Sequence, residues 1–168
     1  LGMAPNVQEM ERLFLIASRQ GDVRAQRALG KAYRSGKSLE QNFKKAISFL
    51  NLAIKQQDSE AQFVLGQMRM RGEGGDVNLK DAVLNFREAA NNGHMLAQFT
   101  LAEMLHRGNL IKMDVKEAAY FYEQAALQGH MLSQYRTAMF YEKGQAGIQE
   151  RARAAKFYKL SAKQGHIP

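Results

Sequence analysis

The sequence predicts an all-α fold, a right-handed α/α superhelical solenoid built from helix-turn-helix repeats of 36 residues. Three observations predict it. The same residue types return along the 168-residue sequence at an offset of 36. Apolar residues inside each repeat follow the spacing of a helix face. Glycine and Asx residues recur where helices end and begin. One such repeat cannot cover its own apolar face, so we expect neighbouring repeats to stack.

Four complete units follow one another along the chain, at 21–56, 57–92, 93–128 and 129–164. Residues 1–20 match the second half of a unit, with Asn6 in the place of Asn42, and residues 165–168 begin a further unit. We therefore expect one repeat array over residues 1–168. Because this array begins and ends inside a unit, we expect the sequence to be a segment of a longer protein.

The first unit shows how each helix is predicted. Ala25, Leu29 and Tyr33 fall on one helical face that ends before Gly36, and this half predicts a helix that we call helix A. After a loop of about seven residues, an apolar stripe over residues 43–56 predicts a second helix, which we call helix B.

The residue before each helix B predicts how well that helix is capped. Asn42, Asn78 and Asp114 each carry a side-chain oxygen that can accept from the first free backbone N–H groups. Glu150 stands at the same place in the fourth unit and is a poor N-cap, so we expect the loop before it to be looser.

Small residues recur where the two helices of a unit must approach each other, and they predict an antiparallel hairpin with a short distance between the helix axes. On helix A they are Gly30, Gly66, Ala102 and Ala138, and on helix B they are Ala53, Ala89, Ala125 and Ser161.

Short motifs return in register, namely Ala-Gln-x-x-Leu-Gly at 25–30 and 61–66, Lys-Ala at 45–46, and Ala-Ala at 89–90 and 125–126. Their joint spacing resembles the Sel1-like repeat, a relative of the tetratricopeptide repeat with a slightly longer unit. Thr137 departs from this pattern by replacing its Leu, and Arg69 and Leu105 replace the Tyr found at position 33.

The resemblance implies a non-catalytic adaptor that gathers other proteins. Sel1-like proteins occur in bacterial envelope and secretion systems, in host interaction, and in quality control in the endoplasmic reticulum. The compartment therefore stays open between a bacterial periplasm, envelope or secreted location and the lumen of the endoplasmic reticulum.

Three positions of helix A lie opposite the face that meets helix B. By resemblance to the tetratricopeptide fold, helix A lines the concave side of the solenoid, and these positions are the expected site for a protein or peptide partner. The candidate residues, which we call the helix A row, are Arg27, Lys31, Arg34, Phe63, Met70, Phe99, Tyr135 and Met139.

Each part of the helix A row has an alternative interpretation. The rings of Phe63, Phe99 and Tyr135 form either an aromatic track for a peptide or packing against the next unit. The methionines suit an adaptable binding floor, but Met also fills gaps in a core. The cations of the first unit, with Arg24 beside them, either dock an acidic partner segment or form a solvated face.

Two further patterns have structural explanations. His94, His130 and His166 share one position at the start of helix A, where Asp22 and Asp58 stand earlier. Units about 10 Å apart cannot bring these rings to one metal ion, so we expect a helix-start role and no metal. The glycine-rich run at 72–75 lacks the flanking residues of a phosphate-binding loop and is predicted to be a loop only.

Composition and charge exclude other classes of function. The sequence has no Cys and no apolar run long enough to span a membrane. The first 20 residues are neutral, and the four units that follow carry net charges of +6, −2, −1 and +5, which add up to +8. The basic charge therefore lies at the two ends and does not form the continuous basic track of a nucleic-acid binder. No catalytic motif or cofactor motif is present, so we expect no enzyme, no small-molecule cofactor and no nucleic acid.

Two other functions compete with binding through helix A. The chain is alternatively a structural part of a bacterial envelope, secretion or host-interaction assembly that uses the convex helix B face. A third class, an enzyme acting on carbohydrate or peptidoglycan, would require turnover by the isolated chain.

Overall fold

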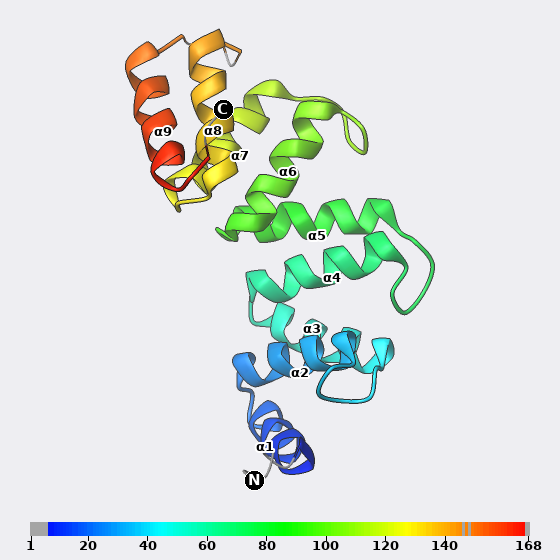
Figure 1. Cartoon of the computed structure of the whole chain (residues 1–168). Coiled ribbons are helices and arrows are strands. Elements are labelled where there is room, and N and C mark those ends of the chain that lie inside the picture. The colour runs from blue at the N-terminus through cyan, green and yellow to red at the C-terminus, as the bar shows by residue number, and fades with distance from the viewer. Residues whose placement is uncertain (1–6, 146, 148, 167–168) are drawn as a thin grey trace. The chain divides into compact units, whose positions relative to one another are not determined.

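The computed structural model describes residues 7–145, 147 and 149–166. Over these residues the chain forms nine α-helices of 13 residues each and no strand (Figure 1). In chain order they are α1 (Val7–Arg19), α2 (Val23–Ser35), α3 (Phe43–Lys55), α4 (Ser59–Arg71), α5 (Leu79–Asn91), α6 (Met95–Arg107), α7 (Val115–Leu127), α8 (Met131–Lys143) and α9 (Arg151–Lys163).

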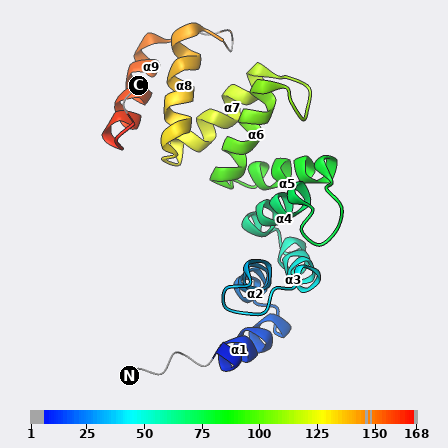
Figure 2. The ribbon, with the colours of Figure 1, turned by 45° about the vertical axis from the view of Figure 1, so that its right-hand side comes forward.

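The helices recur every 36 residues, which confirms the predicted repeat and the all-α class. Helix A of the four units is α2, α4, α6 and α8, and helix B is α3, α5, α7 and α9. The helix α1 occupies the place of a helix B ahead of the first complete unit. Asn6, expected as its cap, lies outside the described residues, as do residues 167–168. Figures 1 and 2 both show α8 and α9 side by side as an antiparallel pair.

The chain divides into two compact units, 1–88 and 89–168, and each has its own core. In the first, Leu29, Leu50, Leu65 and Met68 form the centre of a buried apolar cluster that α2, α3 and α4 build together. In the second, Leu101 and Tyr122 are fully buried, and other residues cluster around Phe157 of α9. Each core thus draws on successive helices, as stacked repeats require.

Short polar side chains start the helices, as predicted. Asn42, Asn78 and Asp114 each accept from a backbone N–H three residues on, at 2.9 to 3.0 Å. Glu150 makes no such bond to α9, so it is the poor cap that the sequence indicates. Residues 146 and 148 of the loop before it lie outside the described residues, so a looser loop stays a prediction.

Glycines end each helix A and allow the helices of a unit to approach closely. Gly36 ends α2 in the left-handed conformation, with φ of 68°, which a side chain disfavours. A Cβ added to Gly30 would lie 2.7 Å from Leu50 Cγ, and one added to Gly66 would lie 2.8 Å from Phe86 Cε1. The absence of a side chain at these two glycines therefore lets helix B pack closely against helix A.

The glutamine that recurs in every helix A is a buried hydrogen-bonding hub. Gln98 Nε2 donates to the carbonyl of Ala90 at 3.1 Å, and its Oε1 accepts from Gln128 Nε2 at 2.8 Å. Gln128 Nε2 also donates to the carbonyl of Gly93 at 3.0 Å. This bond set returns around Gln26 with Gln56 and around Gln134 with Gln164. This glutamine thereby connects helix A to the last turn of the preceding helix and to the residue that follows its own helix B.

The helices are short and amphipathic. Within the part of the chain that the structure describes, no helix has the length and apolar character needed to cross a membrane.

Candidate functional site

The cations of the helix A row in the first unit are paired with acidic side chains of the second repeat. Arg27 Nη1 lies 2.6 Å from Asp58 Oδ2, and Lys31 Nζ is hydrogen-bonded to Glu60. Because Asp58 is also the N-cap of α4, Arg27 binds directly to the start of the next helix A.

Arg34 makes the most enclosed of these contacts. Its Nε lies 2.6 Å from Glu73 Oε2, and its Nη1 donates to Gln67 Oε1 at 2.8 Å. Exposed ion pairs contribute about 0 to 1 kcal/mol each, whereas the Arg34 and Glu73 side chains are both largely buried. The basic first repeat and the acidic second repeat thus balance each other inside one compact unit.

The apolar residues of the row within the compact unit 1–88 are partly buried in its core. Phe63 is only 8% exposed, and its ring centroid lies 5.6 Å from that of Phe86. Met70, near the end of α4, is half-buried. The Phe63 ring therefore packs against helix B of its own repeat, a contact that neither of the two interpretations given above describes.

Within the compact unit 89–168, the row carries two aromatic residues, and both are half-exposed. Phe99 lies 4.5 Å from the His130 ring, and Tyr135 lies 4.7 Å from the His166 ring. Tyr135 also lines an open recess of about 470 Å³ with Tyr158 and other residues of α8 and α9. Met139, one helical turn further on, is half-buried.

Three residues at the same repeat position of the row, Arg27, Phe99 and Tyr135, each contact the residue 31 positions later. Arg27 meets the acid Asp58, whereas Phe99 and Tyr135 meet histidines. The contact of these histidines with the row was missed, although the matching of residue types at an offset of 31 is visible in the sequence.

The sequence assigns His94, His130 and His166 to helix starts. This is confirmed for His94 and His130, whose Nδ1 atoms accept from Ala97 N at 3.1 Å and from Ser133 N at 3.3 Å. Residues 167–168 lie outside the described residues, so the role of His166 stays a prediction.

Burial has an electrostatic consequence at His130. Burial lowers the pKa of His130 below its ordinary value, because a charged imidazolium loses hydration there. The neutral ring can accept the capping hydrogen bond, whereas the protonated ring has no free lone pair to do so.

Glu103, on α6 between the rings of the row, joins several helices and was not among the predicted site residues. Its carboxylate accepts from the Tyr122 hydroxyl at 2.6 Å and lies 2.7 Å from Arg107 and 3.2 Å from Arg136. Burial by itself raises the pKa of Glu103, but the Tyr122 hydrogen bond and the two cations outweigh it and hold that pKa below its ordinary value. Glu103 therefore stays charged and links α6 to Tyr122 of α7 and to Arg136 of α8.

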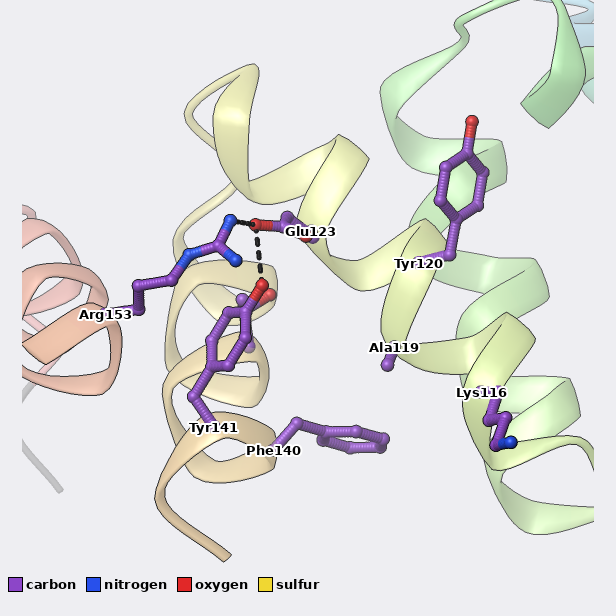
Figure 3. Close-up of a pocket in the computed structure, with 8 residues that line it drawn as sticks. Lys116, Ala119, Tyr120, Glu123, Phe140, Tyr141 and Arg153 are labelled. Carbon is purple, nitrogen blue, oxygen red and sulfur yellow. Dashed lines mark hydrogen bonds and ion pairs between the residues drawn. The ribbon is translucent and has the colours of Figure 1, made fainter. Parts of the chain in front are cut away.

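A second recess, of about 210 Å³, lies among α7, α8 and α9 (Figure 3). On one wall the Glu123 carboxylate accepts from the Tyr141 hydroxyl at 2.9 Å and from Arg153 at 2.7 Å. The Arg153 guanidinium also lies 4.5 Å from the centre of the Tyr141 ring. Burial, together with the hydrogen bond to Glu123, raises the pKa of Tyr141 to about 12. None of these three residues is among those predicted from the sequence.

Neither recess has the composition of a metal site. No group of three or more His, Cys, Asp or Glu side chains capable of holding a metal ion occurs within residues 7–145, 147 and 149–166. The side chains that gather in the two recesses are mainly aromatic, cationic and hydroxyl groups, with one carboxylate in each, and they are suited to binding by contact and hydrogen bonding.

Comparison with known families and structures agrees with the repeat geometry. The family model described as Sel1 repeat matches the chain four times, at residues 23–58, 59–94, 96–130 and 132–166. A comparison with curated proteins finds no match.

Several solved structures are similar to the chain. One is a protective antigen present in uropathogenic Escherichia coli strains and displaying an SLR fold; it is 30% identical with a TM-score of 0.83, over 92% of this chain and 33% of that chain. Another is a Sel1 repeat protein from Oxalobacter formigenes, 25% identical with a TM-score of 0.80, over 96% of this chain and 66% of that chain. The chain thus spans about a third of the first protein and two thirds of the second.

A more distant structure supports the fold alone. Cysteine rich protein B of Helicobacter pylori is 15% identical with a TM-score of 0.61, and the match covers 76% of this chain and 92% of that chain. The helix-pair repeat is therefore retained at low sequence identity.

Proposed function

This chain belongs to the Sel1 repeat family, and from that premise we propose that it is a non-catalytic scaffold that binds a protein or peptide partner through the helix A row. Members of this family commonly mediate protein–protein interaction, and the Sel1 repeat solenoid is typically a non-enzymatic scaffold. The proposal adds the surface that this chain uses.

The observation that carries the proposal is the pair of half-exposed rings at one helix position in consecutive repeats. Phe99 and Tyr135 are each held against a histidine at 4.5 and 4.7 Å. A ring fixed by a neighbour loses little conformational freedom on binding, and amphipathic aromatic residues are frequent anchors of interfaces. Met139 adds an adaptable apolar contact beside them.

The paired cations of the first unit give a second type of contact. A guanidinium has five N–H donors, and Arg27 directs its described contacts at Asp58 and Glu60 only. Lys31 remains exposed while paired with Glu60. An acidic partner residue would share these cations, so this part of the row supports orientation and specificity more than affinity.

A display selection with matched variants tests the proposal. The chain is used to select short linear peptides from a random library, and the dissociation constant of each synthesised peptide is measured by fluorescence anisotropy. A Tyr135→Lys, Met139→Lys variant changes the helix A row, and a Leu84→Lys, Leu127→Lys variant adds the same charge to helix B. Thermal melts of both variants serve as the control that each of them folds.

We expect the helix A variant to bind at least about tenfold more weakly, since interface anchors typically contribute more than 1.4 kcal/mol. We expect the helix B variant to bind like the parent. Equal binding by parent and helix A variant would exclude the row as the binding surface. Incubation with peptidoglycan fragments should give no turnover, and any product formation would contradict the non-catalytic part of the proposal.

A second candidate is an assembly or host-interaction role through helix B. Large apolar residues stand out on these helices, with Leu84 51% exposed, Tyr120 56% and Leu127 66%. Exposed apolar residues of this kind mark interaction surfaces when they gather, and the similar E. coli structure is described as a protective antigen. Loss of binding in the helix B variant alone would favour this candidate.

A further inference from the structure

The recess among α7, α8 and α9 exists because two positions of the repeat lose side-chain volume together. Thr137 stands on α8 where Leu29, Leu65 and Leu101 stand in the other helices A. Ala119 faces the same recess from α7, where the earlier helices B carry Ile47 and Val83. In the first unit Ile47 packs against the cluster that contains Leu65, so the equivalent junction there is filled with hydrocarbon.

The Thr137 hydroxyl is an unsatisfied group at the floor of this recess. Thr137 is 2% exposed and lines the recess, and its Oγ1 has no hydrogen-bond partner. Buried polar atoms almost always have a partner, so such an exception calls for an explanation. A rotation of about 120° about χ1 moves Oγ1 to another of the three staggered positions on Cβ, so the hydroxyl can turn toward the recess that Thr137 lines without moving the helix.

Water alone is a poor occupant of this space. A volume of about 210 Å³ is well above the roughly 10–15 Å³ that one water molecule needs, so the recess has room for several. An ordered water needs two to four polar partners; Glu123, Tyr141 and Arg153 offer them on one wall only, and Ala119 and Phe140 present hydrocarbon. Displacing poorly held water by a group that fits gains affinity.

The size and the lining select the chemistry of the occupant. Small-molecule and cofactor sites usually have volumes of about 300–1,000 Å³, so this recess of about 210 Å³ fits one side chain of a larger ligand better than a cofactor. Glu123 is the one carboxylate among the described residues that line the recess and already accepts from Tyr141 and Arg153, so a cationic occupant would have no free carboxylate to pair with. An uncharged group that can both donate and accept fits the Thr137 hydroxyl.

The rim of the recess provides a path for the rest of the ligand. Tyr120, on α7, lines the recess and is exposed, and Leu127 lies two helical turns further along the same helix face. Lys116 and Arg153 line the recess as well. An extended peptide can therefore lie along α7 and direct one side chain inward.

We propose that this recess binds the side-chain carboxamide of a Gln or Asn residue in a partner peptide, with Thr137 Oγ1 as its hydrogen-bonding partner. A carboxamide both donates and accepts, and its planar group fits beside the ring of Phe140. Ser or Thr would leave much of the space empty. The site lies among α7, α8 and α9 and uses no residue of the helix A row, so it stands or fails separately from the function proposed above.

The test begins with short linear peptides selected on the chain and counter-selected on a Thr137→Leu variant. The leucine restores the residue found in the other repeats and fills the floor, so this variant is expected to fold and to melt at a higher temperature than the parent. Thr137→Val keeps the shape and removes only the hydroxyl. The Tyr135→Lys, Met139→Lys variant is the control for the helix A row.

The proposal expects selected peptides that share a Gln or Asn. Their binding should weaken at least about tenfold with Thr137→Leu and by a smaller factor with Thr137→Val, and it should be unchanged in the control. Replacing the peptide carboxamide by the isosteric carboxylate removes its N–H donors and should weaken binding. The proposal is overturned by a selection that yields no such peptides, by equal binding to Thr137→Leu, by a shared apolar residue indifferent to Thr137→Val, or by a structure with ordered water alone at Thr137.

Discussion

His130 combines a structural hydrogen bond with a group that titrates near neutral pH. As the N-cap of α8 it needs a neutral ring, and burial lowers its pKa in the folded chain. When pH falls from about 6.5, the unfolded chain therefore binds this proton before the folded chain does. The contribution of His130 to stability is complete above the unfolded pKa and is lost as pH falls through the folded pKa.

We predict that a His130→Asn variant loses part of the decline in melting temperature that the parent shows below about pH 6.5. Asparagine caps without titrating, as Asn42 does at the start of α3. Melting curves of both proteins over a pH series measure the difference. Parallel declines in the two proteins would show that the imidazole does not control this pH dependence.

The buried glutamine hub gives a second prediction. Replacing Gln98 by Leu removes two hydrogen bonds, although the Ala90 carbonyl still accepts from Gly93 N and the Gln128 amide still donates to the Gly93 carbonyl. Each bond contributes about 0.5–1.5 kcal/mol, so the free energy of unfolding measured in urea should fall by about 1–3 kcal/mol. Gln128→Ala, at an exposed position, is the matched control and should cost less. A neutral Gln98→Leu variant would show that the hub adds no stability.

These residues also show what the sequence can and cannot reveal at this scale. Aligning the repeats identifies Gln26, Gln62, Gln98 and Gln134 at once. Their partners lie 8 and 30 residues away in other elements, at offsets that a search at 36 does not examine. Residue identity is therefore predictable here, whereas the contact depends on how neighbouring helices pack.

At the scale of a single helix, α9 lacks the cap that the other complete helices B have. Glu150→Asn should supply it and raise the free energy of unfolding by about 0.5–1 kcal/mol, the lower part of the range for N-caps. The change also removes the exposed ion pair of Glu150 with Arg153 at 3.6 Å, which is worth little. Asp114→Ala, which removes the cap of α7, should lower stability by a similar amount. Thermal melts measure both, and a destabilised Glu150→Asn variant would refute the capping argument.

The contact between the two helices of a repeat gives the fourth prediction. Alanine is favoured over glycine inside a helix by about 1 kcal/mol, yet Gly66→Ala places a Cβ 2.8 Å from Phe86 Cε1 and 3.2 Å from the Ala82 carbonyl oxygen. Overpacking of this kind costs about 1–3 kcal/mol, so we expect a net loss of stability in chemical denaturation. A Gly66→Ala, Phe86→Leu double variant should recover part of it. A single variant more stable than the parent would mean that the helices separate without cost.

Helix boundaries were the most predictable feature of the fold. The expected helix B at 43–56 is observed as Phe43–Lys55, with Gln56 as its C-cap. The agreement has a physical cause, because Asn42 and Gly36 fix the ends through their own side chain and backbone rather than through distant contacts.

At the scale of the molecule, the sequence leaves two interpretations open for the cations of the first repeat, which either dock an acidic partner segment or form a solvated face. In the structure Arg27, Lys31 and Arg34 are paired with carboxylates of the following repeat. The repeat period and the all-α class can be predicted from the sequence because the same helix pattern recurs in every unit. The recess at Thr137 does not, because it depends on two substitutions on separate helices that become neighbours only when the repeats stack.

The central claim is that a partner binds on the helix A row, and amide hydrogen exchange of the chain with a bound peptide tests it most directly. The peptide should be one whose binding is unaffected by Thr137→Leu, so that the recess among α7, α8 and α9 is not involved. We predict slower exchange on binding in α6 and α8, around Phe99, Tyr135 and Met139, and little change in α7 and α9. Slower exchange confined to α7 and α9 would contradict the claim and place the partner on helix B.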